Sequence, residues 1–262
     1  MEASEQSLVK EKYKELFNLN EQAVNLIHNL WDKNPIKISN LLEGLAAAYL
    51  GKCYKTHRAT LLLCKDGFGE DALILCRGMF HLIVNFLYIQ KDDTGQRVTR
   101  YMDYEWVVRR DTLEAVKQGN PVNDYIRKRL AEEAEVVKEI YENAVKVEQK
   151  WGYERRLAWS DKSIEGMANE VGLGYQYKTI YAHFCQIDHA GPLNTNDFVK
   201  DDGEEGFIIA SGPSEQFVDQ ALLFAFQVIF QMTEAWAKVF KVDIRRELEM
   251  LTDELEKVVA KE

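Results

Sequence analysis

The apolar run from Ala72 to Ile89 constrains the fold of this chain more than any other feature. It reads ALILCRGMFHLIVNFLYI, so a helix over these residues is apolar on every side. Such a helix must be buried, either inside a domain or in a membrane. A membrane span needs about 20 apolar residues with few charges. Because Arg77 and His81 stand at the centre of the run, we expect a core helix and no membrane span.

Polar side chains interrupt this run at four-residue steps: Arg77, His81 and Asn85, with Tyr88 close to the same line. Four residues turn a helix by about 400°, so these side chains form one stripe. A buried guanidinium is costly unless it is paired and hydrogen-bonded, so an acidic group must face Arg77 or the stripe must line a wet cavity. Two interpretations stay open. The stripe is either a pocket in which Arg77 clamps an anion and His81 moves protons, or a structural network that fixes helix register. Gly78 is expected to permit close approach of another backbone.

The rest of the chain predicts an all-α fold, an antiparallel multi-helix bundle with much more helix than the usual third. Only four prolines and fifteen glycines interrupt the chain, and apolar residues recur at three- and four-residue steps. The expected helices cover residues 5–33, 41–64, 70–90, 94–118, 122–150, 162–170, 175–189, 214–240 and 243–262.

A short hairpin or ordered loop is expected near residues 191–214, where apolar residues flank Asp201-Asp202-Gly203. No repeat or linker is visible, so we expect a single helical domain over residues 1–262. The C-terminal helices, residues 214–262, should pack on the rest of the chain or on a second subunit.

A second cluster, YKTIYAHFCQIDHAGP, places Tyr181, Asp188 and His189 on one predicted helix. His189 falls at its end, where the helix dipole favours the charged imidazole. Asp188 and the tyrosine hydroxyls are the nearest acceptors for the stripe, so we expect the two helices to face one another around a shared polar cavity.

A third cluster, RYMDYEWVVRR at residues 100–110, mixes aromatic and charged groups and adds Tyr104 to the candidate pocket. Asp103 or Glu105 in this stretch is the alternative partner for Arg77. The alternative is that this cluster has only a structural role, as part of an amphipathic helix with surface ion pairs.

Composition narrows the classes of function. The net charge of −10 argues against a uniformly basic nucleic-acid surface. The spacing of the four cysteines fits neither a zinc site nor a compact disulfide framework, so no metal or cofactor is predicted and a reducing compartment is expected. The N-terminus has no apolar signal region, which favours a cytoplasmic protein.

Several landmarks in order resemble a bacterial helical family catalogued as domain of unknown function 5677. They are the apolar helix led by Arg77, the RYMDYEWV stretch after a short acidic gap, Trp159-Ser160, Gly172, and the helix with Tyr175, Tyr181 and His189. The resemblance covers about residues 40–195. That family commonly has a glutamate where His81 stands, so an intrahelical Arg–Glu pair does not carry over.

The family resembles, more distantly, the HEPN helical ribonucleases of prokaryotic defence and toxin systems. Those enzymes cleave RNA without a metal, using an arginine and a histidine separated by four to six residues, usually across a dimer. Here Arg77 and His81 have three residues between them, and the pairs Lys52–His57 and Lys178–His183 have the gap but a lysine.

Two hypotheses of function follow. The preferred hypothesis is a non-enzymatic helical binding module of a prokaryotic defence or toxin-type system, with a protein partner from the same operon. The alternative is a dimeric, metal-independent ribonuclease using Arg77, His81 and His189. A homodimer is expected under both, because the long first helix, the C-terminal leucine stripe and the apolar helix near 217–230 offer more apolar face than one bundle needs. RNA is a partner only under the alternative, since the charge does not indicate it.

Overall fold

The structure is a computed structural model that describes residues 2–118, 124, 128, 132–152, 159–188, 199–201, 203, 206–209 and 211–260. The described chain is mostly helical, which confirms the all-α prediction. It divides into two compact units, which are described separately. One comprises Met1–Lys91 with Ile164–Glu262, and the other comprises Asp92–Ser163.

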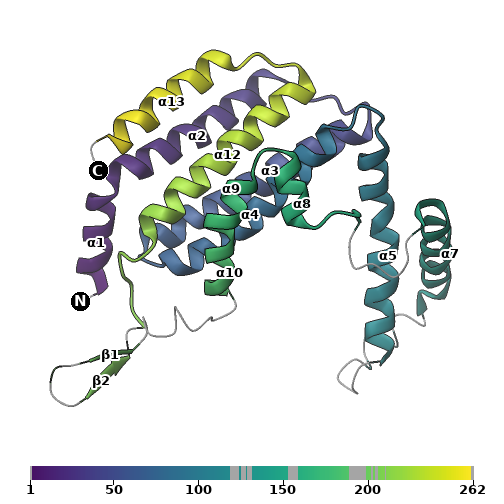
Figure 1. Ribbon diagram of the computed structural model, residues 1–262, viewed down its shortest axis with the longest axis horizontal. Helices are drawn as coiled ribbons and strands as arrows, with labels where there is room; N and C mark the ends of the chain where they lie inside the picture. The colour runs from purple at the N-terminus through teal and green to yellow at the C-terminus, as the bar shows by residue number, and fades with distance from the viewer. Residues whose placement is uncertain are drawn as a thin grey trace. The chain divides into compact units, whose positions relative to one another are not determined.

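The first unit holds most of the helices and a small hairpin (Figure 1). Its elements are α1 (Glu2–Lys12), α2 (Lys14–Lys33), α3 (Leu41–Lys65), α4 (Gly69–Gln90), α8 (Ile164–Glu170), α9 (Gly174–Gln176), the π-helix η2 (Tyr177–Tyr181), α10 (Ala182–Asp188), β1 (Val199–Asp201), β2 (Phe207–Ile209), α12 (Val218–Phe240) and α13 (Arg245–Val259). The second unit contains α5 (Gln96–Gln118) and α7 (Ala134–Trp151).

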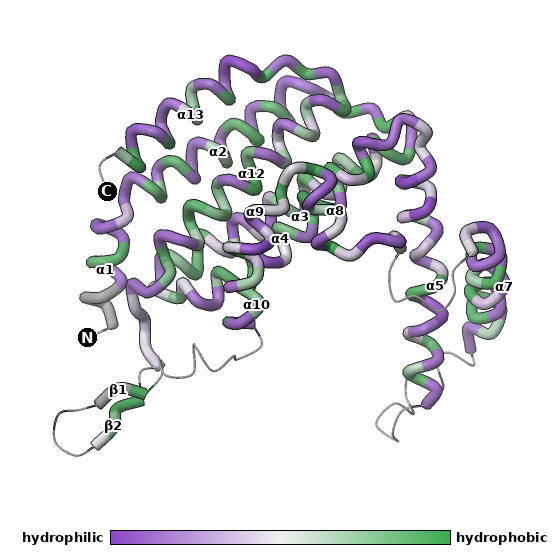
Figure 2. Tube along the Cα trace, in the orientation of Figure 1, coloured by the Kyte–Doolittle hydropathy of each residue, from purple (hydrophilic) through white to green (hydrophobic). Residues whose placement is uncertain are grey.

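The core of the first unit lies where α3, α4 and α12 pack against one another. α12 carries hydrophobic residues along its length, whereas α13 is more hydrophilic (Figure 2). The core contains several of the largest fully buried side chains, namely Phe80, Phe86, Trp236, Leu50 and Met79. α2 covers α12 on one side, and α13 in turn packs on α2. Burial of these apolar surfaces is the main force that holds the unit together.

α4 is the one helix among the described residues that is long and apolar enough to cross a membrane. It packs against α3, α12, α8 and α10. A core helix of a folded domain passes the same test of length and composition, and α4 has the contacts of a core helix.

A buried polar node ties α2 to α3 and α12. The side chain of Asn20 lies 2.8 Å from Nε2 of His57 and donates to the backbone carbonyls of Leu16 and Leu222. His57 is fully buried, and burial lowers its pKa to about 4, so the imidazole is neutral at pH 7. This burial also removes the Lys52–His57 pair as an RNA-cleaving pair, because the imidazole cannot reach solvent.

Several element boundaries differ from those predicted. The first helix breaks at Tyr13, where the backbone turns to φ −102 and ψ 22. The helix expected over residues 214–240 begins only at Val218. The Ser214 hydroxyl accepts from the N–H of Gln216, and Phe217 before the helix has a left-handed conformation. The start of α3 at Leu41 agrees with the expected helix over residues 41–64, and the side chain of Asn40 caps it by accepting from the N–H of Glu43. The residues before α12 lie against Gly69 at the start of α4, and a local capping pattern does not report this tertiary contact.

The predicted hairpin is present. β1 and β2 are antiparallel, with Val199 opposite Ile209 and Asp201 opposite Phe207. Residues 191–198, the first part of the region in which the hairpin was expected, lie outside the described residues.

The second unit rests on the contact between α5 and α7. α7 buries Ile140, Ala144 and Val147, so one face of this helix is apolar. Asp103 accepts hydrogen bonds from Lys150 and from the indole N–H of Trp151, both at 2.8 Å.

A close backbone crossing occurs at Gly69 and not at Gly78. A Cβ at Gly69 would lie 2.1 Å from the carbonyl oxygen of Gln216, whereas a Cβ at Gly78 would meet nothing within 4 Å. Ser214 donates its N–H to the carbonyl of Gly67 beside this crossing. The expectation of a close approach at Gly78 is therefore wrong, because that position is on an exposed part of α4.

We predict opposite effects of alanine at these two glycines. Gly69→Ala should lower the free energy of unfolding by about 2 kcal/mol or more, because backbone atoms must shift. Gly78→Ala should raise it by about 0.5–1 kcal/mol, because alanine favours helix. Urea denaturation measures both. Equal effects would contradict the crossing at Gly69.

Candidate functional site

The polar stripe of α4 lies on one half-buried face of the helix. Arg77, His81 and Asn85 each keep part of their surface exposed. The amide of Asn85 donates to the carbonyl of His81, one turn earlier, at 2.7 Å. That bond keeps the amide against its own helix.

Arg77 forms an ion pair with Asp188 on α10. Its Nη1 lies 2.5 Å from Oδ2 of Asp188, and the two side chains are 28% and 23% exposed. The guanidinium also lies over the ring of Tyr181, 5.7 Å from its centroid, within the range of a cation–π contact. The predicted juxtaposition of the stripe with Asp188 is confirmed, so Asp188 is the acidic partner. Asp103 and Glu105 are not, since Asp103 binds α7 and Glu105 pairs with Arg109.

His81 and Tyr181 share a hydrogen bond of 2.6 Å between Nε2 and the phenolic oxygen. Burial and the neighbouring Arg77 charge lower the pKa of His81, and burial raises the pKa of Tyr181. Both groups are therefore neutral at pH 7. The Tyr181 ring stacks on the ring of Tyr177, with 5.0 Å between the ring centroids, and packs against the ring of Phe80, with 5.2 Å between the centroids. Polar and aromatic contacts together dock this segment on α4.

The segment that carries Tyr181 includes a turn of π-helix. η2 covers Tyr177–Tyr181, and the N–H of Ala182 donates to the carbonyl of Tyr177, five residues earlier. A π-helical turn is rare and often marks a functional site. Here it lies in one continuous helical run with α9 and α10, hereafter the 174–188 segment.

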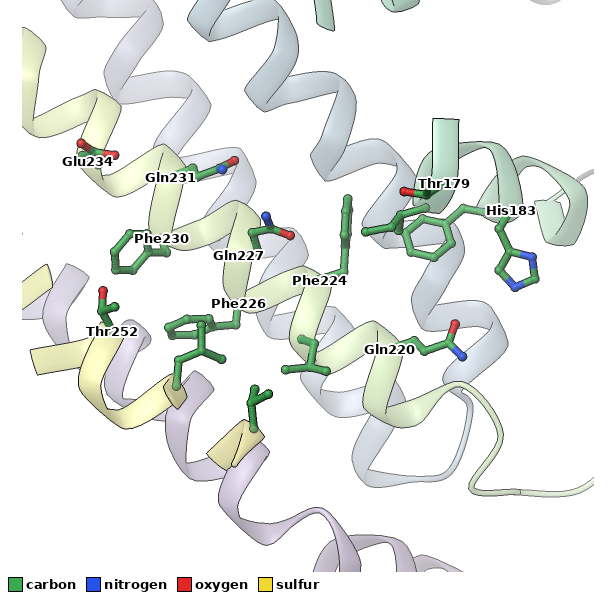
Figure 3. A pocket seen from close by; sticks show the side chains of 15 residues that line it. Thr179, His183, Gln220, Phe224, Phe226, Gln227, Phe230, Gln231, Glu234 and Thr252 are labelled. Carbon is green, nitrogen blue, oxygen red and sulfur yellow. The ribbon is translucent and has the colours of Figure 1, made fainter. Parts of the chain in front are cut away.

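The other side of the 174–188 segment forms a wall of a groove. The groove has a volume of about 750 Å³ and is lined by Thr179, Ile180, His183, Phe184, Gln220, Leu223, Phe224, Phe226, Gln227, Phe230, Gln231, Glu234, Thr252, Leu255 and Val259. Figure 3 shows the α12 side chains forming the floor, with Thr252 of α13 on one side and Thr179 and His183 on the other.

The chemistry of the groove is that of a binding surface. Phenylalanine, leucine, isoleucine and valine side chains provide most of the lining, and glutamine and threonine side chains provide hydrogen-bonding groups. His183 and Glu234 are its ionisable residues. Glu234 is 3.0 Å from Lys238, and the ring of His183 packs edge-on against Phe217. Apolar pockets with a few polar groups typically bind ligands by burial.

The structure unites some of the predicted site residues and separates others. The structure brings four of them into contact, since Arg77 pairs with Asp188 and His81 shares a hydrogen bond with Tyr181. Asn85 lies on the same stripe of α4. Tyr88 is buried in the core at 7% exposure. Tyr104 belongs to α5 in the second unit, and His189 lies outside the described residues.

Sequence reasoning missed the groove itself. A signal was present: Gln220, Gln227 and Glu234 interrupt the apolar C-terminal helix at seven-residue intervals, so they share one face.

We predict that Arg77 and Asp188 are coupled by about 1 kcal/mol in a double-mutant cycle with Arg77→Met and Asp188→Asn, since the pair is partly desolvated. The pair Lys12–Glu215, whose side chains are 53% and 63% exposed, is the control and should show coupling near zero. Chemical denaturation of each variant provides the free energies. Equal coupling in the two pairs would show that Arg77 does not hold α10.

The comparisons agree with the resemblance noted from the sequence. A family model described as Family of unknown function (DUF5677) matches residues 43–207, more than half of the chain. The match includes Arg77, His81, Tyr181 and Asp188 and ends before α12. Searches of curated proteins and of solved structures gave no match. The chain is therefore a member of the DUF5677 family.

Proposed function

We propose that this protein is a non-enzymatic helical interaction module whose binding site is the groove between α12, α13 and the 174–188 segment. The observation that carries the proposal is the use of the polar stripe. Arg77 and His81 contact Asp188 and Tyr181 on the inner side of the segment whose outer side lines the groove. The stripe thus acts as a structural support for a binding wall.

The pairing of Arg77 and the net charge of the protein favour an interaction module over a ribonuclease. An arginine that stabilises a phosphate needs its guanidinium free to meet the ligand, and that of Arg77 is engaged by a carboxylate. The net charge of −10 also opposes RNA binding.

One observation favours the metal-independent ribonuclease as a second candidate. Nε of Arg77 is buried and has no hydrogen-bond partner in the part of the chain that is described, and it lies on the same face as the neutral His81. A substrate phosphate that displaced the Asp188 carboxylate from Arg77 would accept that bond. His81 would then transfer protons, together with His189 as inferred from the sequence.

The cellular setting is part of the proposal and rests on the sequence and the resemblance. We place the protein in the cytoplasm, as a homodimer in a prokaryotic defence or toxin-type system, with a protein partner from the same operon.

The ribonuclease hypothesis predicts cleavage of single-stranded and structured RNA that is lost in His81→Ala, although circular dichroism shows that the variant keeps its helical fold. The interaction-module hypothesis predicts no cleavage by the parent protein. Cleavage that His81→Ala abolishes, with the fold intact, would overturn the proposal.

Binding in the groove is tested with a neutral, environment-sensitive apolar dye such as Nile red. Gln227→Trp should fill the groove and reduce dye fluorescence, because Gln227 lies on its floor. Gln149→Trp, the same change at an exposed position of α7, is the control and should leave the signal unchanged. Equal fluorescence in both variants would contradict a binding groove.

A further inference from the structure

The groove is elongated. Its floor follows α12 from Gln220 to Glu234, a span of about 21 Å at the 1.5 Å rise of a helix. It has a wall on each side, formed by α13 and by the 174–188 segment. This shape suits a rod-like segment lying parallel to α12 better than a compact molecule.

The floor and one wall each repeat every seven residues. On α12, Gln220, Gln227 and Glu234 form one line, and Leu223 and Phe230 form the next. On α13, Thr252 and Val259 are seven apart, with Leu255 between them. Seven-residue repeats of this kind form the seam against which another helix packs. α13 uses its own neighbouring stripe, Leu251 and Val258, for burial.

Carboxylates border the groove along α13. Glu249 and Glu256 are exposed and lie one turn before and one turn after Thr252, on the side of α13 away from Leu251 and Val258. Glu234 adds an acidic group to the floor. On the other wall, the exposed Tyr175 lies one turn before Thr179, where its ring is available to a partner. A ligand that lies in the groove therefore meets negative charge along one edge.

We propose that the groove binds an amphipathic helix of a partner protein, with an apolar face of about four turns and lysine or arginine residues along the edge that faces α13. The apolar face would cover the partly exposed Leu223 and Phe230 of the floor together with Leu255 and Val259 of α13. The basic edge would meet Glu249 and Glu256. The glutamines and threonines would select the register, as polar residues in a helical seam do. This inference rests on the proposed function and deepens it by naming the partner.

The test uses two synthetic 18-residue helical peptides labelled with fluorescein. Both carry leucines in the seven-residue pattern, and the flanking positions are lysine in one and glutamate in the other. Fluorescence anisotropy should show that the parent protein binds the lysine peptide at least about tenfold more tightly, with an affinity that falls as salt is raised.

Two variants locate the binding. Gln227→Trp should abolish binding of the lysine peptide. Glu249→Lys with Glu256→Lys should reverse the preference toward the glutamate peptide. The matched control, Glu139→Lys with Glu142→Lys on exposed positions of α7, changes the net charge equally and should leave the preference intact. Melting temperatures confirm that each variant is folded.

The remaining outcomes overturn the inference in distinguishable ways. Equal binding of both peptides, or binding unaffected by Gln227→Trp, rejects the basic helix as occupant. Dye binding in the groove without peptide binding indicates a small apolar ligand, and the proposed function then stands. A dimer that Gln227→Trp dissociates identifies a second copy of the chain as the occupant. A parent protein that binds neither the dye nor either peptide rejects the groove and the proposed function together.

Discussion

The ion pair between Arg77 and Asp188 is the interaction on which the candidate site depends. It joins the one guanidinium of the apolar helix α4 to the end of α10 and, with the His81–Tyr181 hydrogen bond, holds the 174–188 segment in place. A partly exposed ion pair contributes little to the stability of a whole domain. The role of this ion pair is to hold the 174–188 segment in position, because the outer face of that short helical run lines the groove.

The groove exists because α12 and α13 each bury one part of their surface in the core and leave another part facing outward. α12 buries most of its circumference against α2, α3 and α4, yet leaves a line of glutamine, leucine and phenylalanine facing outward. α13 rests on α2 through Leu251 and Val258, and Leu255 and Val259 project into the groove. The family match ends before both helices, so the floor and the α13 wall lie outside the matched region. The wall formed by the 174–188 segment and its polar support lie inside it.

The sequence predicted the helices, the core role of the Ala72–Ile89 run and the meeting of Arg77 with Asp188, because each follows from periodicity or from the cost of burying a charge. It did not predict the node of Asn20 and His57, since Asn20 occupies an apolar position of α2 and its partners are distant in the chain. The groove also escaped prediction. The leucine stripe of the last helix indicated one packed face, but only the arrangement of α2 and α12 shows that half of it packs and half lines a groove.

The central claim is that the polar stripe supports the groove wall, and amide hydrogen exchange tests it most directly. In Asp188→Asn, we expect protection of the amides in the 174–188 segment to fall about tenfold, because local opening becomes easier by the lost pairing energy. Protection within α12 should stay unchanged, and Glu215→Gln, which breaks the exposed pair with Lys12, should alter neither region. Unchanged protection of the 174–188 segment in Asp188→Asn would contradict the account.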